Sequence, residues 1–211
     1  MTVRGVLFDI GGVIVTDGPD LDEVARALGL RNGPGTLERV GRAVWGRRDP
    51  YDLDLSDAEY WRAVASAAGA EPPTDAVIEQ LTARDVARWS RPRVEVVGLV
   101  ADLYGAGLTL GVLSNAPRSF AAGFRSQPWA RVFDVAVFSC DTGVAKPAPG
   151  AYRRAVEEFA RHGVAAHEIV FLDDRPGNVG PARAAGLVAH RWVGTDDARD
   201  VLIGVGVPLG G

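Results

Sequence analysis

Val6-Leu7-Phe8-Asp9-Ile10-Gly11-Gly12-Val13-Ile14-Val15 is the stretch that decides the fold. It carries no charge before Asp9, and two glycines follow, which is typical of a fully buried strand that ends in a tight loop. An acid at the carboxyl end of a parallel strand lies where open α/β sheets bind their ligands. The glycines let the backbone approach a bound group closely. The stretch therefore predicts a central strand with a candidate site directly after it.

The composition of the 211 residues is that of a globular protein, with 47% hydrophobic and 24% charged residues. A formal net charge of −4 leaves no basic footprint for nucleic acid. No apolar run approaches the roughly 18 residues of a membrane span, and the N-terminus enters a strand without a signal-type segment. We therefore expect a cytoplasmic protein without a membrane partner. Its one cysteine, Cys140, cannot form an intramolecular disulfide, and we expect it to be a small buried residue.

Strand and helix patterns alternate along the second half of the chain. Buried strands are predicted at 108–113, 132–138, 169–172 and 187–192, and helices at 94–104, at 151–161 and around 181–185. Such alternation requires parallel pairing with right-handed crossovers. The predicted fold class is therefore α/β, a three-layer Rossmann-like domain with a parallel sheet.

The segment between the first strand and residue 90 has no strand pattern. It consists of apolar residues at helical spacing, separated by Gly-Pro, Asp-Pro and Pro-Pro breaks. Ser56 and Glu59 form a plausible capping box for one of these helices. We therefore predict a core domain at 1–16 and 90–211 with a helical cap inserted at 17–89.

The insertion contains three of the five tryptophans: Trp45, Trp61 and Trp89. We expect most of them to pack inside a small helical bundle, while the remainder could line a pocket that faces the loop after Asp9. The run from Arg47 to Pro50 is expected to be a solvated turn, with an anion site as the alternative.

Residues whose side chains could take part in catalysis or binding follow four of the predicted strands. They are Asp9, the pair Ser114 and Asn115, Lys146, and the pair Asp173 and Asp174. Because the carboxyl ends of parallel strands share one edge of the sheet, these side chains should converge. Several carboxylates in one cleft repel each other unless a cation lies among them, and Mg²⁺ suits oxygen ligands best.

A phosphoryl group fits this predicted set of residues. Lys146, the only lysine in the chain, would place a compact positive charge near phosphate oxygens. Ser114 and Asn115 could donate hydrogen bonds to the same oxygens. Phosphoryl transfer depends on such positioning and charge stabilisation, and a carboxylate can attack phosphorus to form an aspartyl phosphate.

The chain resembles the haloacid dehalogenase superfamily, and within it the phosphatase members with a helical cap after the first strand. The resemblance covers nearly the whole chain and rests on four motifs: Phe8–Val13, Leu113–Asn115, Gly143–Pro147 and Phe171–Asn178. The stretch 138–186 is similar to the N-terminal phosphatase domain of mammalian soluble epoxide hydrolase. Small bacterial sugar-phosphate phosphatases are similar as well.

The resemblance implies a role for each matching residue. Asp9 would be the nucleophile and a Mg²⁺ ligand, Ser114 would bind the transferring phosphoryl group beside Asn115, and Lys146 would neutralise the phosphate. Asp174 would be a metal ligand, supported by Asp173 and Asn178. Gly11 would bind the metal through its backbone carbonyl, and both Gly11 and Gly12 would lie against the substrate.

Position 11 departs from the pattern of the family, whose phosphatases usually have an aspartate there as general acid and base. Glycine keeps the carbonyl but loses the proton transfer, which is worth ~10²–10⁴-fold in rate. A good leaving group or an acid from the cap could compensate, and Asp17 and Asp20 lie close in sequence.

Three functions follow from these residues. The first is a Mg²⁺-dependent phosphatase of a small phosphorylated metabolite. The second is a weak or inactive homologue that binds a phosphorylated ligand or protein. The third is a 2-haloacid dehalogenase, although that branch usually has an aromatic residue where Gly11 stands and lacks the acid pair. The oligomeric state, monomer or homodimer, stays open.

Overall fold

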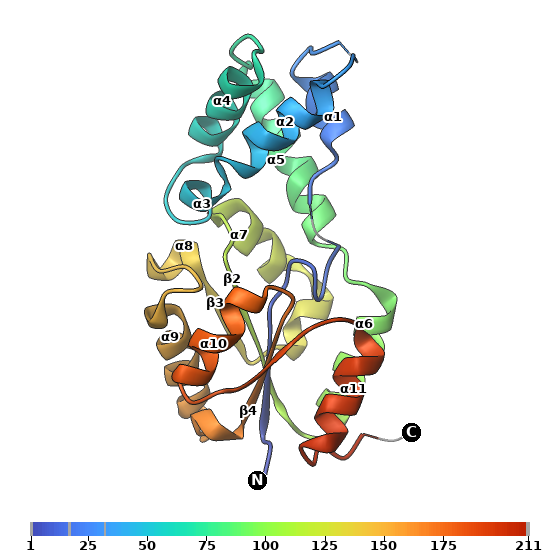
Figure 1. Cartoon of the computed structure of the whole chain (residues 1–211), viewed down its shortest axis with the longest axis vertical. Helices are drawn as coiled ribbons and strands as arrows, with labels where there is room; N and C mark the ends of the chain where they lie inside the picture. Colours follow the sequence, from blue (N-terminus) through green and yellow to red (C-terminus); the bar gives the residue numbers. More distant parts are fainter. Residues whose placement is uncertain (1, 17, 32, 210–211) are drawn as a thin grey trace.

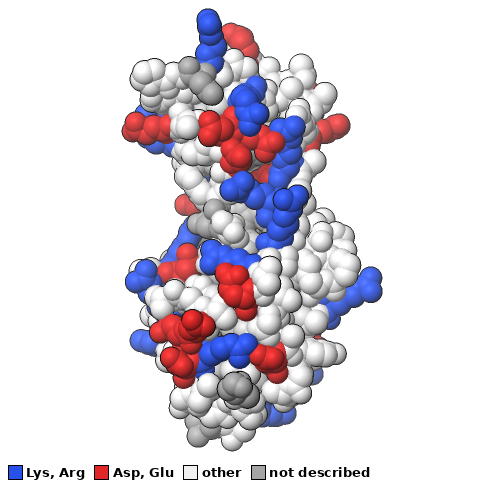
Figure 2. Space-filling view, turned by 90° about the vertical axis from the view of Figure 1, so that its right-hand side faces the viewer, with Lys and Arg blue, Asp and Glu red and all other residues white. Residues whose placement is uncertain are grey.

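The computed structural model describes residues 2–16, 18–31 and 33–209, which form two lobes joined at a narrow waist (Figures 1 and 2). The lower lobe is built on a five-stranded parallel sheet with strand order β3-β2-β1-β4-β5. Its strands are β1 (Gly5–Phe8), β2 (Thr109–Ser114), β3 (Val135–Phe138), β4 (Ile169–Asp173) and β5 (Val188–Arg191). The predicted α/β class and parallel sheet are confirmed.

Helices cover both faces of this sheet, which makes the three layers. The helices α9 (Pro149–Arg161) and α10 (Pro176–Ala184) pack on one face, and α6 (Val94–Gly105) and α11 (Thr195–Gly204) lie on the other. Towards the upper lobe lie α7 (Arg118–Ser126) and the short α8 (Ser139–Thr142). Short 3₁₀ turns occupy Pro128–Val132 and Ala166–Glu168.

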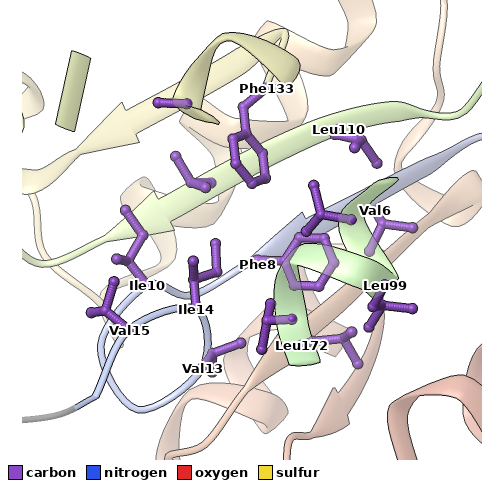
Figure 3. Close-up of a cluster of buried hydrophobic side chains, with 14 of the residues drawn as sticks. Val6, Phe8, Ile10, Val13, Ile14, Val15, Leu99, Leu110, Phe133 and Leu172 are labelled. Carbon is purple, nitrogen blue, oxygen red and sulfur yellow. The ribbon is translucent and has the colours of Figure 1, made fainter. Parts of the chain in front are cut away.

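The opening apolar stretch is strand only as far as Phe8, because the chain turns back after Asp9. Ile10, Val13, Ile14 and Val15 leave the sheet but stay fully buried, and Figure 3 shows their side chains around the same cluster as Phe8. The third strand begins at Val135 rather than at residue 132, because Val132 ends the 3₁₀ turn that starts at Pro128.

The upper lobe, called the helical lobe below, consists of α1 (Leu21–Ala27), α2 (Thr36–Trp45), α3 (Arg48–Tyr51), α4 (Asp57–Ala68) and α5 (Asp75–Trp89). These helices enclose their own apolar cluster, which includes Tyr60, Trp61 and Val64. The predicted capping box is present, since Ser56 Oγ accepts from the Glu59 amide and Glu59 accepts from the Ser56 amide.

The two chain connections between the lobes run side by side. Val15 pairs with Pro92, and the Arg93 amide donates to the Ile14 carbonyl at 2.8 Å. Helix α5 then continues down onto α7, where a Cβ on Gly123 would lie only 2.4 Å from Val86 Cγ1. The glycine therefore allows the helical lobe to seat closely on the sheet domain.

Candidate active site

The four groups of residues predicted from the strand ends lie together at the edge of the sheet that faces the helical lobe. Asp9 directly follows β1, and its amide donates to the Leu172 carbonyl of the neighbouring β4 at 2.9 Å. Ser114 and Asp173 are the last residues of β2 and β4. Lys146 reaches the same edge from the loop after α8, as its contacts show.

Lys146 is the electrostatic centre of the site. Its Nζ lies 2.8 Å from Asp9 Oδ1 and 2.7 Å from Asp173 Oδ2, and all three side chains are buried. The two carboxylates raise the pKa of Lys146 against the opposing effect of burial, so the ammonium stays charged. The buried Lys146 ammonium therefore links Asp9 of the first motif to Asp173 of the fourth.

Asp173 is held by donors on both of its oxygens. Asn178 Nδ2 lies 2.9 Å from each oxygen, and the Arg175 amide donates to Oδ1 at 2.9 Å. Together with Lys146, these donors surround a side chain with no exposed surface. Asp173 therefore orients Lys146, and its own oxygens are already engaged.

Asn115 holds the backbone of Lys146. Its Nδ2 donates to the Lys146 carbonyl at 2.8 Å, and its Oδ1 accepts from the Lys146 amide at 2.8 Å. This two-point contact fixes the lysine loop against the end of β2. Sequence reasoning expected Asn115 to donate to phosphate, and the contact with the lysine loop is a role it did not foresee.

Burial raises the pKa of Asp9 to about 6, and the nearby Asp173 carboxylate acts in the same direction, while Lys146 opposes both. The Ile10 amide and Lys146 both contact Oδ1 of Asp9, at 2.7 and 2.8 Å. The carboxylate is thus fixed in orientation and poorly solvated. Both properties suit a nucleophile, and a cation beside the carboxylate would favour its ionised form.

Asp9, Asp173 and Asp174 offer carboxylate oxygens that all lie within 4.8 Å of one another. Gly12, at φ +74°, allows one of them to approach the loop, because a Cβ there would lie 2.5 Å from Asp174 Oδ2. Since Asp173 is surrounded by its donors, Asp9 and Asp174 are the acids best suited to a cation. Their hard oxygen atoms fit Mg²⁺.

A cavity of about 40 Å³ lies between this edge and the helical lobe. From the sheet domain it is lined by Asp9, Gly11, Ser114, Asn115, Lys146, Arg175 and Asn178, and from the helical lobe by Trp45, Arg48, Asp52 and Trp89. A water molecule needs roughly 10–15 Å³ of such space. The cavity therefore has room for a few water-sized groups.

Arg48 corrects an expectation from the sequence. The run from Arg47 to Pro50 was expected to be a solvated turn, but Arg48 begins α3 and is buried. Its Nε lies 2.8 Å from Asp52 Oδ1 and its guanidinium also pairs with Asp85, while the rings of Tyr51 and Trp89 lie over it. The pattern of the local sequence gave no sign of this, because Asp85 is 37 residues away.

The three tryptophans of the helical lobe have different surroundings. Trp61 packs in the interior of the lobe, as expected. Trp45 and Trp89 line the cavity, and Trp89 also packs edge-to-face on Phe120 of α7. The expectation that some of these tryptophans would line a pocket near Asp9 thus holds for Trp45 and Trp89.

Asp20, one of the two acids suggested from sequence proximity, does not line the cavity. Asp17 lies outside the described residues. Asp20 caps α1, where its Oδ1 accepts from the Glu23 amide at 3.1 Å. Among the described residues of the helical lobe, the acid that lines the cavity is Asp52, and no motif in the sequence marked it.

Residues 3–186 match the model of the haloacid dehalogenase-like hydrolases. The chain belongs to this family. It is 27% identical over 187 residues to a phosphoglycolate phosphatase of Yersinia pseudotuberculosis, with 87% of this chain and 78% of that protein covered.

Solved structures of the family share the fold. A family enzyme from Bacteroides thetaiotaomicron, in complex with magnesium and inorganic phosphate, aligns at a TM-score of 0.64 and 18% identity, covering 90% of this chain and 93% of the other. L-2-haloacid dehalogenase from Xanthobacter autotrophicus, with chloropropionic acid covalently bound, aligns at 0.67 and 20% identity, covering 98% and 84%.

The surface and the helices add two observations. On the face shown in Figure 2, basic and acidic side chains are interspersed over both lobes. No helix in the described part of the chain is both long and apolar enough to cross a membrane.

Proposed function

We propose that this hydrolase is a Mg²⁺-dependent phosphatase that acts on a small phosphorylated metabolite through a phosphorylated Asp9. The observation that carries the proposal is the position of Lys146, whose ammonium lies between Asp9 and Asp173 at the wall of the cavity. A buried cation beside a fixed carboxylate is suited to bringing an anionic group onto a nucleophile. The phosphoglycolate phosphatase relatives support the same class of reaction.

In the first step, Asp9 attacks phosphorus, a new P–O bond forms at its carboxylate, and the ester P–O bond breaks. Lys146 and the Ile10 amide hold Oδ1, so we assign the attack to Oδ2. Ser114 Oγ at the end of β2 would donate to a phosphoryl oxygen, and the Lys146 ammonium would offset negative charge. In the second step, water attacks phosphorus and releases inorganic phosphate and Asp9.

Asp9 and Asp174, with the Gly11 carbonyl, would hold Mg²⁺, which when bound supplies positive charge next to the phosphoryl oxygens. Gly12, in the loop after Asp9, contributes to the metal site through its lack of a side chain. Gly12 leaves space for the Asp174 carboxylate, as shown by the 2.5 Å contact that a Cβ would make.

The helical lobe, within residues 17–89, would act as the cap. Trp45, Arg48, Asp52 and Trp89 cover the cavity from above, so this lobe would exclude water and contact the leaving group. Substrate selectivity would then depend on these four side chains, with the sheet domain handling the phosphoryl group.

The test measures release of p-nitrophenol from p-nitrophenyl phosphate with and without Mg²⁺, for wild type, Asp9→Asn and Gly11→Asp. We expect Mg²⁺-dependent turnover that Asp9→Asn abolishes and Gly11→Asp preserves or raises. Absence of turnover, here and across a panel of phosphate esters, would contradict the proposal and favour a binding protein. Chloride release from 2-chloropropionate would identify a dehalogenase instead.

A further inference from the structure

The cavity contains a second carboxylic acid besides the nucleophile, and it comes from the helical lobe. Among the described residues that line the cavity, only Asp9 and Asp52 carry carboxyl groups. Gly11, where most phosphatases of the resembled branch have their acid, lines the same cavity without a side chain. Apart from the nucleophile Asp9, the carboxylic acid in the described lining of the cavity therefore comes from the helical lobe.

Asp52 is fixed to the sheet domain close to the end of β2, the strand that ends at Ser114. It follows α3, and its backbone carbonyl accepts a hydrogen bond from Ser139 Oγ at the start of α8. The same Ser139 oxygen accepts from the Ala116 amide at 2.9 Å, two residues after Ser114. Next to Asp52, the Tyr51 hydroxyl lies 3.2 Å from Ser119 Oγ of α7. This end of α3 is thus tied to the segment that follows Ser114, through Ser139 and Ser119.

The surroundings of Asp52 allow its carboxyl group both to donate and to accept a proton. Its side chain is buried, and burial raises its pKa to about 7, with Asp49 and Asp85 acting in the same direction and Arg48 opposing them. Its Oδ1 pairs with Arg48 Nε at 2.8 Å, which leaves Oδ2 as the oxygen that can carry a proton. A general acid–base works best when its pKa is near the working pH.

Asp85, the other buried acid of the helical lobe near Arg48, is engaged differently. Its Oδ1 accepts from Trp89 Nε1 at 2.9 Å, and its Oδ2 accepts from Arg48 at 3.3 Å. It does not line the cavity, within the described residues. Asp85 therefore holds Arg48 and Trp89 in place from outside the cavity, whereas Asp52 pairs with Arg48 and also lines the cavity.

We propose that Asp52 is the general acid and base of this enzyme, supplied by the cap in place of the side chain that Gly11 lacks. The inference rests on the proposed phosphatase function. As the ester bond to phosphorus breaks, the leaving oxygen takes the proton of the Asp52 carboxyl group and departs as an alcohol. The Asp52 carboxylate then accepts a proton from water as that water attacks the phosphorus of phosphorylated Asp9, which restores both acids.

The test uses substituted phenyl phosphates of nearly equal size, from p-nitrophenyl to phenyl and p-methoxyphenyl phosphate. The nitrophenolate leaves without a proton, whereas the less acidic phenols need one. We expect Asp52→Asn to lower kcat/KM by ~10²-fold or more for phenyl and p-methoxyphenyl phosphate, and by less than ~10-fold for p-nitrophenyl phosphate. Asp54→Asn changes an exposed acid on the same segment and should behave like wild type.

Two further measurements separate catalysis from structure. For phenyl phosphate, kcat/KM of wild type should fall as the pH rises through about 7, because Asp52 loses the proton that it donates, and this limb should be missing in Asp52→Asn. Adding Gly11→Asp to Asp52→Asn should restore turnover of the poorer leaving groups. A merely structural role predicts neither result.

The outcomes distinguish the two proposals. If wild type hydrolyses the series but Asp52→Asn slows every member equally, or if Gly11→Asp fails to restore phenyl phosphate turnover, Asp52 is not the acid and the phosphatase function stands. If wild type hydrolyses none of the esters with Mg²⁺ present, both proposals are overturned. Circular dichroism of Asp52→Asn, and the activity of Asp52→Glu, show whether a loss reflects folding.

Discussion

Replacing Lys146 with methionine should destabilise the protein far more than an ordinary loss of a charged side chain. The change keeps most of the aliphatic stem but leaves Asp9 and Asp173 buried without the cation between them. At 2.7–2.8 Å and an effective dielectric constant near 20, each contact has a Coulomb energy of about 6 kcal/mol before desolvation is subtracted. Breaking a buried pair by removing one partner costs about 3–5 kcal/mol.

Because Lys146 neutralises two carboxylates, we expect a loss in the upper half of that range. Urea unfolding at pH 7.5 without divalent cations, followed by tryptophan fluorescence, measures it. Arg154→Met is the matched control, since Arg154 contacts Glu157 and Glu158 at 3.2 and 3.1 Å but is about 44% exposed. Exposed pairs of this kind contribute little, so the control should lose less than about 1 kcal/mol.

A double-mutant cycle identifies the cause of the loss. Asp173→Asn removes one of the two buried negative charges, so Lys146→Met should cost at least about 1 kcal/mol less in that background than in wild type. Additive effects of the two substitutions, or a loss for Lys146→Met no larger than that of Arg154→Met, would refute the picture of a lysine held between two carboxylates.

Three other predictions follow from single contacts. Gly12→Ala should abolish the rise in Tm that Mg²⁺ produces, because its Cβ would lie 2.5 Å from Asp174 Oδ2. The control Gly69→Ala, at the same φ of +74° with nothing nearby, should lower the free energy of unfolding by about 1–3 kcal/mol and keep the Mg²⁺ response. Equal responses of the two variants to Mg²⁺ would contradict the assignment of Asp174 as a metal ligand. Burial and the neighbouring Asp141 raise the pKa of the Cys140 thiol to about 11. Iodoacetamide should therefore label the native protein very slowly at pH 8 and faster as the pH rises towards 11. Rapid labelling at pH 8 would contradict this, because it would show that the thiol is accessible and ionised. Gly123→Ala should lower phosphatase activity by forcing α5 away from α7, and adding Val86→Ala should restore it; a Gly123→Ala variant with full activity would mean that the seating of the helical lobe does not matter.

The sheet and the edge that carries the site could be predicted from the sequence because both depend on local patterns. Buried parallel strands are continuous apolar runs, and their ends are marked by the first polar residues, Asp9, Ser114 and Asp173. Parallel pairing then brings those ends to one side whatever lies between them. The packing of α11 was not predicted, since its sequence has only a few apolar residues, of which Ala198 and Leu202 are buried.

The part of the cavity formed by the helical lobe could not be predicted in the same way. Arg48 and Asp52 lie in a short polar segment that looks like a surface turn. Arg48 is nevertheless buried, in contact with Asp85 and Trp89 from a helix that begins at residue 75. Their environment is set by contacts between helices and between lobes, for which no periodicity in the segment itself gives a sign. Asn115 is similar, because its partner is the backbone of Lys146, 31 residues away.

Trapping the phosphorylated enzyme tests the central claim most directly. Wild-type protein is mixed with p-nitrophenyl phosphate and Mg²⁺, quenched in acid, reduced with borohydride and digested, and the peptide containing residue 9 is examined by mass spectrometry. We predict that Asp9 is converted to homoserine, the product of reducing an aspartyl phosphate, and that Asp9→Asn gives no such peptide. Turnover of the ester with an unmodified Asp9, or with phosphate found on Ser114 instead, would contradict the account.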